Sequence, residues 1–544
     1  MAYSTFAAID IGSSCMEMVI YEISRDNGIK KIDHIRHIFE LGKSTYETRE
    51  VDFEDVEKMC DILYGFSEIM KDYCIDDYRA FATSALREAK NAIRVLDRIK
   101  VRTGIDVEIL SNSEQRFIIY KALAAGSDKF NRIIEKSTAL VDVGAGSTQV
   151  SLFDNGTLVT TQNVKLGAVR ISNMMSTLSQ NIVNYVDIMR EYIDNDMVTL
   201  NELFLKSRKI NNVIFVGDCV PYYARMKEFF DGGEYTTRNK FKDFFDKIYH
   251  KSIEQIAEFM KLQENEAKLI LPGAMVYMRM LDFTQAEDIW MPQVTLCDGM
   301  AVEHAQKTKK FELKHDFNAD ILAAAKNISQ RYSIRGEHVS LVEKNSLLIF
   351  DSIKKYHGLS SRERFLLEIA SILHDCGQYI NMLNPEQCSY SIIMSTEIIG
   401  LSHKEREIIA NIVKYNTMVF DADDALWSFD KKDYLTIAKL TAILRLSNAL
   451  DRGHRQKFKD IDVNIESNKL VITAYTFEDI TLENHILWSV WISLRRYMGL
   501  SLLSEGRDRG LERGRIWETV RFLSTGSLAG LNLMRGYLVR RRMS

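Results

Sequence analysis

Proline and paired cysteines are scarce in this sequence of 544 residues. Only four prolines occur, so few positions are barred from a helix interior and long helices are expected. The seven cysteines, at positions 15, 60, 74, 219, 297, 376 and 388, form no CxxC pair and show no zinc-like spacing. An odd, scattered set of this kind is typical of reduced thiols in the cytosol.

Long uncharged apolar runs are also lacking, since none approaches the roughly 20 residues that a membrane-spanning helix needs. The first apolar segment contains Asp10 and has no basic leader, which argues against a signal peptide. The formal net charge is only −4, which gives no bulk attraction to nucleic acid or to an anionic membrane. We therefore expect a cytoplasmic protein with no nucleic-acid partner and no membrane partner.

A glycine-rich turn between two apolar segments is the most informative local pattern. Residues 139–143 form an apolar run with Asp142 near its end, residues 144–148 read Gly-Ala-Gly-Ser-Thr, and residues 150–153 are apolar again. This order predicts a β-hairpin, not the strand–turn–helix of a dinucleotide site. The turn still suits phosphate, because glycines let the backbone approach closely and N–H groups and hydroxyls can surround an anion. Asp142 beside it can hold Mg²⁺ that bridges the phosphates.

The same pattern occurs at the start of the chain, where residues 6–23 read as strand, turn and strand around Asp10, Gly12, Ser13 and Ser14. The two turns are about 130 residues apart, which is too long for a solenoid repeat and fits a duplicated domain. Two such turns facing each other across a cleft would hold a polyphosphate and its metal ion. The alternative is two unrelated hairpins of a β-rich domain.

Helical patterns lie between the two turns. An amphipathic helix is expected over residues 53–75. Arg87 falls at the start of a short predicted helix, where the positive end of the helix dipole disfavours a cation. We therefore interpret Arg87 as a ligand of phosphate, with a plain surface arginine as the alternative. Glu114 follows Ser111 with the spacing of a capping box. Residues 269–274, which contain a Pro-Gly pair, are expected to form a turn.

Five motifs in residues 1 to about 305 resemble those of the exopolyphosphatase / guanosine pentaphosphate phosphohydrolase family, which belongs to the superfamily of actin, sugar kinases and heat-shock chaperone ATPases. They are AIDIGS (8–13), ATSALREAKN (82–91), EILSNSE (108–114), VDVGAGST (141–148) and LGAVR (166–170). The resemblance implies an α/β fold with two ribonuclease-H-like (actin-like) lobes, at residues 1–125 and 126–305, around a cleft. It implies inorganic polyphosphate or pppGpp as substrate and Mg²⁺ at Asp10 and Asp142. The implied phosphate ligands are Gly12, Ser13, Ser14, Gly144, Gly146, Ser147, Thr148 and Gln149.

The chain departs from this family at its catalytic carboxylates. The family places a glutamate that activates the attacking water at the position of Gln115, and glutamine cannot accept a proton at neutral pH. A second family glutamate corresponds to Gln149. Glu114 precedes Gln115 and is a substitute candidate, although adjacent helix residues point about 100° apart. The expected catalytic residues are therefore Gln115, Glu114 and Arg87. Compared with the family, the two phosphate-binding turns are better preserved than the general base.

Residues 310–458 have a helical pattern that resembles an HD-type domain. The segment 366–377 looks like the core of that domain and contains His374 and Asp375, and His338 lies upstream on another helix. The resemblance implies that these three residues would bind a second divalent metal. The fourth ligand position is occupied by Asn448, and two positions that carry further histidines in binuclear HD enzymes look like Cys388 and Asn416. A structural HD fold is therefore favoured over an active one.

The end of the chain changes composition. Residues 459–483 are expected to form a small β-element. The residues after Asn484 contain no lysine but eleven arginines, including those at 540–542, and their structure is not clear from sequence. A solvated or disordered tail is favoured over one that contacts phosphate or acidic lipid.

Three functions follow as hypotheses. The first is hydrolysis of the terminal phosphate of polyphosphate or pppGpp in the Mg²⁺-dependent cleft, because electrostatic positioning supplies much of phosphoryl-transfer catalysis. The second is a sensor that binds these ligands without hydrolysis, and the third is a metal-dependent phosphohydrolase in the HD-type domain. A homodimer is implied by the family resemblance only.

Overall fold

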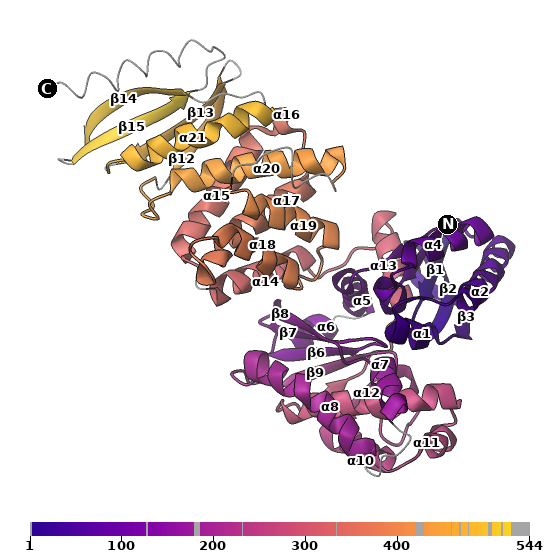
Figure 1. Cartoon of the computed structure of the whole chain (residues 1–544). Helices are drawn as coiled ribbons and strands as arrows, with labels where there is room; N and C mark the ends of the chain where they lie inside the picture. Colours follow the sequence, from indigo (N-terminus) through magenta and orange to yellow (C-terminus); the bar gives the residue numbers. More distant parts are fainter. Residues whose placement is uncertain are drawn as a thin grey trace. The chain divides into compact units, whose positions relative to one another are not determined.

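A computed structural model describes residues 3–126, 129–178, 185–230, 232–332, 334–418, 429–458, 460–466, 469–476, 478–498, 503–512 and 515–523. The chain divides into two compact units, which are treated separately below (Figure 1). Unit 1 comprises Met1–Ala324 and Glu397–Ser402, and unit 2 comprises Ala325–Thr396 and His403–Ser544. Among the residues described, no helix has the length and apolar character that crossing a bilayer requires.

The first sheet of unit 1 has five strands in the order β3-β2-β1-β4-β5. Strand β1 pairs antiparallel with β2 and parallel with β4, β2 is antiparallel to β3, and β4 is parallel to β5. The strands are β1 (Ser4–Ile11), β2 (Cys15–Ser24), β3 (Gly28–Ile38), β4 (Asp77–Ala82) and β5 (Val107–Ile109).

Helices cover both faces of this sheet. Ala7 and Ile9 of β1 belong to one apolar cluster with residues of α2 and α4, while Phe6 stacks on His304 of α13 with ring centroids 4.3 Å apart. Because successive residues of a strand point to opposite faces, β1 is buried from both sides. The predicted helix over 53–75 is confirmed as α2. The helices around this sheet are α1 (Leu41–Thr48), α2 (Phe53–Asp72), α3 (Ser84–Glu88), α4 (Ala92–Thr103), α5 (Asn112–Gly126) and α13 (Leu296–Lys307). Helix α6 (Lys129–Ile134) follows α5 and leads to the second sheet, where its Phe130 ring packs edge-on against Phe153.

The second sheet of unit 1 repeats the first. Its order is β10-β11-β9-β6-β7-β8, so β6 pairs antiparallel with β7 and parallel with β9, as β1 does with β2 and β4. This repeated topology confirms the predicted pair of ribonuclease-H-like lobes and, with them, the duplication. The strands are β6 (Thr138–Val143), β7 (Thr148–Asp154), β8 (Thr157–Val164), β9 (Asn212–Gly217), β10 (Tyr235–Thr237) and β11 (Asp288–Trp290).

The turn expected at residues 269–274 is wrong, because this segment lies inside helix α12. Pro272 and Gly273 are both buried there, and the hydroxyl of Tyr223 donates a hydrogen bond to the carbonyl of Ile270 at 2.9 Å. Burial of the whole apolar run outweighs the helix-breaking tendency of the pair. The helices of the second lobe are α7 (Ala168–Leu178), α8 (Tyr185–Leu200), the π-helix η2 (Asn201–Leu205), α9 (Val220–Tyr223), α10 (Arg238–Tyr249), α11 (Ile253–Met260) and α12 (Glu264–Asp282).

Unit 2 is mostly helical, as predicted for residues 310–458. Helix α14 contains the boundary between the two units, and α15, α17, α19 and α20 pack against one another. The helices are α14 (Phe317–Arg331), α15 (Gly336–Ser352), α16 (Lys354–His357), α17 (Ser361–Leu373), the 3₁₀ helix η3 (Cys376–Tyr379), α18 (Pro385–Ser395), α19 (His403–Lys414), α20 (Lys431–Leu450) and α21 (Thr481–Met498).

A four-stranded antiparallel sheet completes unit 2, with the order β12-β13-β15-β14. Helix α21 packs along α20, and Figure 1 shows this helix beside the sheet. The strands are β12 (Ile461–Glu466), β13 (Lys469–Thr476), β14 (Leu503–Glu512) and β15 (Arg515–Leu523). Part of the arginine-rich tail therefore belongs to the sheet, while residues 524–544, with the arginines at 540–542, lie outside the described residues.

Candidate functional site

The glycine turns that follow β1 and β6 line one cavity of about 220 Å³ in unit 1. The duplicated sheets explain this placement, because each turn closes the equivalent hairpin of its lobe. The predicted residues that line the cavity are Asp10, Gly12, Ser13, Ser14, Arg87, Gln115, Asp142, Gly144, Gly146 and Ser147.

The two turns have the same internal hydrogen bond. The backbone N–H of Gly12 donates to the carbonyl of Cys15 at 2.9 Å, and that of Gly144 donates to the carbonyl of Ser147 at 3.0 Å. Sequence similarity between the turns thus corresponds to similarity of backbone structure. Both turns offer small residues at the cavity wall, where a phosphate group can approach the main chain.

Three hydroxyl groups meet behind the first turn. The Ser13 hydroxyl oxygen lies 2.8 Å from the Tyr46 oxygen and 2.7 Å from the Ser84 oxygen, and those of Tyr46 and Ser84 are 2.8 Å apart. Burial raises the pKa of Tyr46, so this phenol stays protonated. The triangle fixes the first turn against α1 and α3. Tyr46 was not predicted, because no local pattern marks a single tyrosine in a helix.

Arg170 connects the second turn to the same group. Its Nε donates to the carbonyl of Gly146 at 2.8 Å, its Nη2 lies 2.6 Å from a carboxylate oxygen of Glu88, and its guanidinium lies 4.5 Å from the centre of the Tyr46 ring. A Cβ on Gly146 would lie only 2.5 Å from the Tyr46 hydroxyl oxygen, so no larger residue fits unless Tyr46 moves. Tyr46 and Arg170 therefore fix both turns together.

Arg87 and Gln115 are neighbours at the cavity wall. Nη1 of Arg87 donates to the carbonyl of Leu110 at 2.7 Å and lies 3.5 Å from the amide oxygen of Gln115, while its Nη2 donates to Asn112 at 2.5 Å. Burial, together with the nearby Arg116, lowers the pKa of Arg87 to about 10, so it still carries its charge at neutral pH. Arg87 is thus a preoriented cation beside the position where a catalytic carboxylate was expected.

Asp142 is paired with an arginine that the sequence did not indicate. Nη1 of Arg116, on α5, lies 2.5 Å from Oδ2 of Asp142, and both side chains are buried. Burial raises the pKa of Asp142, and Arg116 opposes that shift. The second carboxylate oxygen, Oδ1, has no hydrogen-bond partner. Asp142 therefore has one neutralised oxygen and one oxygen available to a cation.

Three further carboxylates lie close together at the cavity. Burial, with Glu17 and Asp218 adding repulsion, raises the pKa of Asp10 well above its ordinary value, and Oδ1 of Asp10 has no hydrogen-bond partner. Enclosure by protein atoms, with Asp142 adding repulsion, raises the pKa of Asp218 to about 6, although this side chain is open to the solvent of the cavity. Clustered carboxylates of this kind are a common setting for a divalent cation.

Four arginines balance these acids: Arg36, Arg87, Arg116 and Arg225. Only Arg87 was predicted, since the other three come from a strand, a helix interior and a turn with no phosphate-binding pattern. Guanidinium groups bind phosphate oxygens in a bidentate manner. The cavity thus combines cations suited to phosphate with acids suited to a metal ion.

Three predicted residues do not line the cavity. Glu114 caps α5 instead, because its carboxylate accepts from the backbone N–H of Ser111 at 3.0 Å and from its hydroxyl at 2.6 Å. Thr148 donates its hydroxyl to the carbonyl of Leu166. The side chain of Gln149 is buried, and neither of its amide atoms has a hydrogen-bond partner. Glu114 therefore caps the helix, as its capping-box spacing predicted, and its carboxylate is engaged with Ser111.

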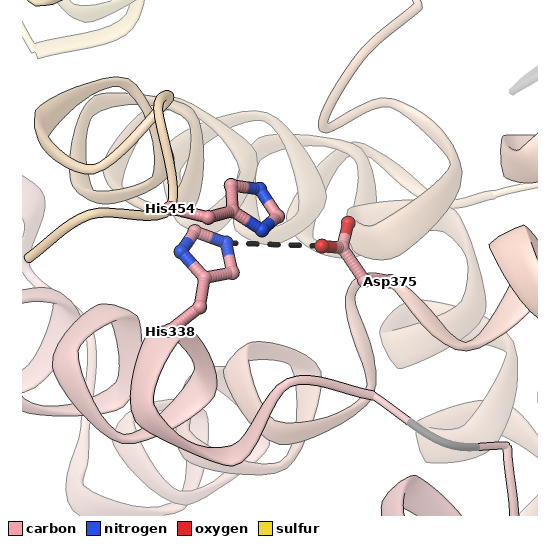
Figure 2. Close-up of side chains that lie close together, drawn as sticks. All are labelled: His338, Asp375 and His454. Atoms are coloured by element: carbon pink, nitrogen blue, oxygen red, sulfur yellow. Dashed lines mark ion pairs between the residues drawn. The ribbon is translucent and has the colours of Figure 1, made fainter.

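The predicted metal ligands of unit 2 also come together, and Figure 2 shows two of them, His338 and Asp375, beside His454. Nε2 of His338 lies 3.1 Å from Nε2 of His374 and 3.7 Å from Oδ2 of Asp375. Burial and the neighbouring His338 lower the pKa of His374, although Asp375 acts in the opposite direction, so this imidazole is neutral at pH 7. Asn448 and Asn416, the two asparagines that the resemblance to HD-type domains implies at ligand positions, are buried.

Comparison with known proteins identifies this architecture. A profile of the Ppx/GppA phosphatase family matches residues 19–308, and one of the Ppx/GppA phosphatase domain III matches residues 322–492. A guanosine-5'-triphosphate,3'-diphosphate pyrophosphatase of Photobacterium profundum is 22% identical over 491 residues, which cover 86% of this chain and 91% of that protein.

Solved structures of the same family are also similar. The Aquifex aeolicus member of the Ppx/GppA family has 20% identity and a TM-score of 0.47, over 56% of this chain and 99% of that one. An exopolyphosphatase from Cytophaga hutchinsonii has 17% identity and a TM-score of 0.49, over 57% of this chain and 100% of that one.

Proposed function

We propose, from the premise that this chain belongs to the Ppx/GppA phosphatase family and is a phosphoanhydride hydrolase, that its cavity removes the terminal phosphate of inorganic polyphosphate or of pppGpp. One observation carries the proposal. Both glycine turns, four arginines and a cluster of carboxylates line the same cavity of unit 1. This combination matches a substrate that is both polyanionic and metal-bound.

The substrate would be positioned by the chain's cations and turns. Arg36, Arg87 and Arg225 line the cavity and would offer guanidinium groups to successive phosphates, and the backbone of the two turns would contact the group that is transferred. Arg116 neutralises Asp142, which reduces the repulsion that an approaching phosphate would otherwise meet. Positioning of this kind supplies a large part of phosphoryl-transfer catalysis.

Mg²⁺ fits the acidic residues of the cavity. Asp10 and Asp142 would hold it, since Oδ1 of each has no hydrogen-bond partner and carboxylate oxygens are the ligands that Mg²⁺ prefers. When bound, Mg²⁺ neutralises charge on the phosphoryl oxygens. Its charge would also relieve the repulsion among Asp10, Glu17 and Asp218.

Asp218 is the best general base in the cavity. Gln115 cannot take a proton from water, and Glu114 is engaged as a helix cap. Asp218 is open to the cavity, and its pKa of about 6 leaves it ionised at pH 7 yet basic enough to accept a proton. In this role it would deprotonate the attacking water while Arg87 stabilises charge on the transferred phosphoryl group.

Phosphate release from long-chain polyphosphate and from pppGpp, with Mg²⁺ present, tests the proposal. We expect the wild-type protein to release phosphate from at least one of the two, and Asp10→Ala to lose that activity. Gln115→Glu supplies the carboxylate that the family places at this position and should increase turnover. If wild-type protein is inert but Gln115→Glu is active, hydrolysis is not its native function.

A sensor that binds without hydrolysis is the second candidate, and a specific observation favours it. Amides occupy the two family carboxylate positions, and neither Gln115 nor the buried Gln149 can act as a base. Tight binding of polyphosphate or pppGpp by an inert wild-type protein would support this function. If His374→Ala abolished hydrolysis while Asp142→Ala did not, the activity would belong to unit 2 instead.

A further inference from the structure

A short segment from the second half of the chain is part of unit 1. Glu397–Ser402 belongs to this unit, although the residues before and after it, up to Thr396 and from His403, belong to unit 2. Ile398 and Leu401 of the segment are fully buried. The segment is therefore built into unit 1 and does not simply pass over its surface.

Gly400 gives the segment its close approach to the rest of unit 1. Its φ of 92° is a conformation that favours glycine, and a Cβ there would lie 2.5 Å from Cδ1 of Ile321 and 3.2 Å from Cε2 of Phe117. Phe117 lies on α5, and its ring packs edge-on against Phe317, with centroids 5.1 Å apart. The segment thus packs against α5, the helix that also carries residues of the cavity.

Glu397 contacts the first turn of the same helix directly. Its carboxylate accepts a hydrogen bond from the hydroxyl of Ser113, which is fully buried. A hydrogen bond to a charged acceptor is stronger than one between neutral groups, and the helix dipole favours a carboxylate near a helix N-terminus. Glu397 should therefore hold the first turn of α5 in place.

The residues at the start of α5 divide between two faces of the helix. Side chains four residues apart lie on the same face. Ser113 and Phe117 thus share the face that contacts the segment. Asn112 and Arg116 share the next face, where Asn112 accepts a hydrogen bond from Nη2 of Arg87 at 2.5 Å and Arg116 lines the cavity. A shift of this turn would move the groups of both faces together.

The charge of Glu397 also acts on Arg87. Burial and the nearby Arg116 lower the pKa of Arg87, whereas Glu397 is one of the groups that act in the opposite direction. Glu397 itself does not line the cavity, so it acts on a bound phosphate only through other groups.

We propose that Glu397 is a positioning residue of the cavity, which fixes the guanidinium of Arg87 through Ser113 and the first turn of α5. This inference rests on the proposed function, because it takes Arg87 as a ligand of the bound phosphate. The sequence neighbours of the segment belong to unit 2. The cavity of unit 1 therefore depends on a contact that the second half of the chain supplies.

Kinetics of phosphate release by the full-length protein test this inference. Glu397→Ala removes the acceptor and Ser113→Ala removes the donor, so each should lower kcat/KM for polyphosphate, by up to about 100-fold if the guanidinium moves by about 1 Å. In the background of Arg87→Ala, Glu397→Ala should cause no further loss, because the group that it positions is gone. Glu54→Gln, at an exposed position of α2, is the control and should leave kcat/KM unchanged.

A purely structural contact gives a different result. It would lower the thermal midpoint of Glu397→Ala and Ser113→Ala but leave kcat/KM of the folded variants unchanged, or reduce kcat/KM equally in the Arg87→Ala background. Either outcome would overturn the inference. Circular dichroism checks that each variant is folded.

Binding of inorganic tripolyphosphate with Mg²⁺, measured by titration calorimetry, separates this inference from the proposed function. If the wild type binds tripolyphosphate but releases no phosphate, hydrolysis fails as the function. The positioning role still predicts about tenfold weaker binding by Glu397→Ala and Ser113→Ala, the effect of one displaced hydrogen bond from a charged group. Unchanged affinity in both folded variants would overturn it, and a wild type that neither binds nor hydrolyses these ligands would overturn both.

Discussion

Asp218 is the single residue on which the proposed hydrolysis depends most directly. Replacing it with asparagine removes the base but keeps the size of the side chain. We expect Asp218→Asn to lower kcat by about 10²–10⁴-fold, the usual contribution of a general base. Asp243→Asn, at an exposed position of α10, is the matched control and should leave kcat unchanged.

The pH profile gives an independent measure of the same residue. Enclosure raises the pKa of Asp218 to about 6, so below that pH the side chain is protonated and cannot accept a proton from water. The kcat/KM of the wild type should therefore rise with pH and level off above about 6, and bound Mg²⁺ should move this rise to lower pH because its charge favours the ionised carboxylate. A profile of Asp218→Asn that still rises through this range would assign the base role elsewhere.

The ion pair of Arg116 and Asp142 should contribute strongly to the stability of unit 1. Both side chains are buried, so removing one partner leaves an uncompensated charge in the core. We expect Arg116→Met to lower the free energy of unfolding by about 3–5 kcal/mol. The double variant with Asp142→Asn should recover part of this loss. Calorimetry of the wild type, both single variants and the double variant would measure it.

The sequence predicts the residues of the site whose significance is local. Asp10 and Gly12 lie in a short pattern that occurs twice, and the pattern itself implies the turn. Arg116 and Tyr46 could not be predicted in this way, because their roles depend on partners that folding brings from elsewhere in the chain. Glu114 shows the opposite case, since its local capping pattern describes its contacts fully.

At the level of elements, the end of β9 depends on one glycine. Gly217 has a φ of 133°, and a Cβ there would lie 2.1 Å from the carbonyl oxygen of Val143. Gly217→Ala should therefore separate β9 from β6 at this end and displace the adjacent Asp218. We expect a lower thermal midpoint and reduced phosphate release. Gly65→Ala, in α2 with open space around it, should stabilise that helix by up to about 1 kcal/mol.

The connection between α15 and α17 should be sensitive to acid. The backbone N–H of Leu359 donates to Nδ1 of His357 at 2.9 Å, so the neutral ring must donate from Nε2 to the carbonyl of Phe350, also at 2.9 Å. Burial lowers the pKa of His357, because a charged ring would lose solvation. Protonation at Nδ1 would also break the bond from Leu359.

The sign of the pH effect follows from that shift. Below the ordinary histidine pKa of about 6.5, the unfolded chain takes up a proton here that the folded chain does not. The stabilisation is therefore complete above that pH and is lost as the pH falls toward the folded pKa. Urea denaturation of unit 2 should show a smaller loss between pH 7 and pH 5 in His357→Gln than in the wild type. Equal losses would contradict this account.

For the whole molecule, two compact units predict two unfolding transitions, of which only one should respond to the ligand of the cavity. Mg²⁺ with polyphosphate should raise the midpoint of that transition, with a gain of about 2.7 kcal/mol at a hundredfold excess over Kd. The transition of unit 2 should not move. Calorimetry of the wild type and of Asp10→Asn, each with and without the ligand, would assign the transitions.

Much of the architecture was predictable because it repeats. Two similar strand–turn–strand patterns implied a duplicated lobe, and the equivalent pairing of β1 and β6 confirms it. The Pro-Gly pair of α12 misled the prediction, because local propensity does not register the burial of a whole helix. The four-stranded sheet of unit 2 was predicted only as far as its first hairpin, since β14 and β15 follow a long helix and carry no clear strand pattern.

The ion pair between Arg116 and Asp142 also breaks the equivalence of the two lobes. Asp10 and Asp142 occupy matching positions, each one residue before the end of its strand, β1 or β6, yet of the two only Asp142 has an ion pair with the chain itself. The counter-ion of Asp142 is therefore part of the chain and cannot be removed by dialysis. The dependence of hydrolysis on Mg²⁺ should accordingly follow a simple hyperbola for one exchangeable ion, with no cooperativity between two.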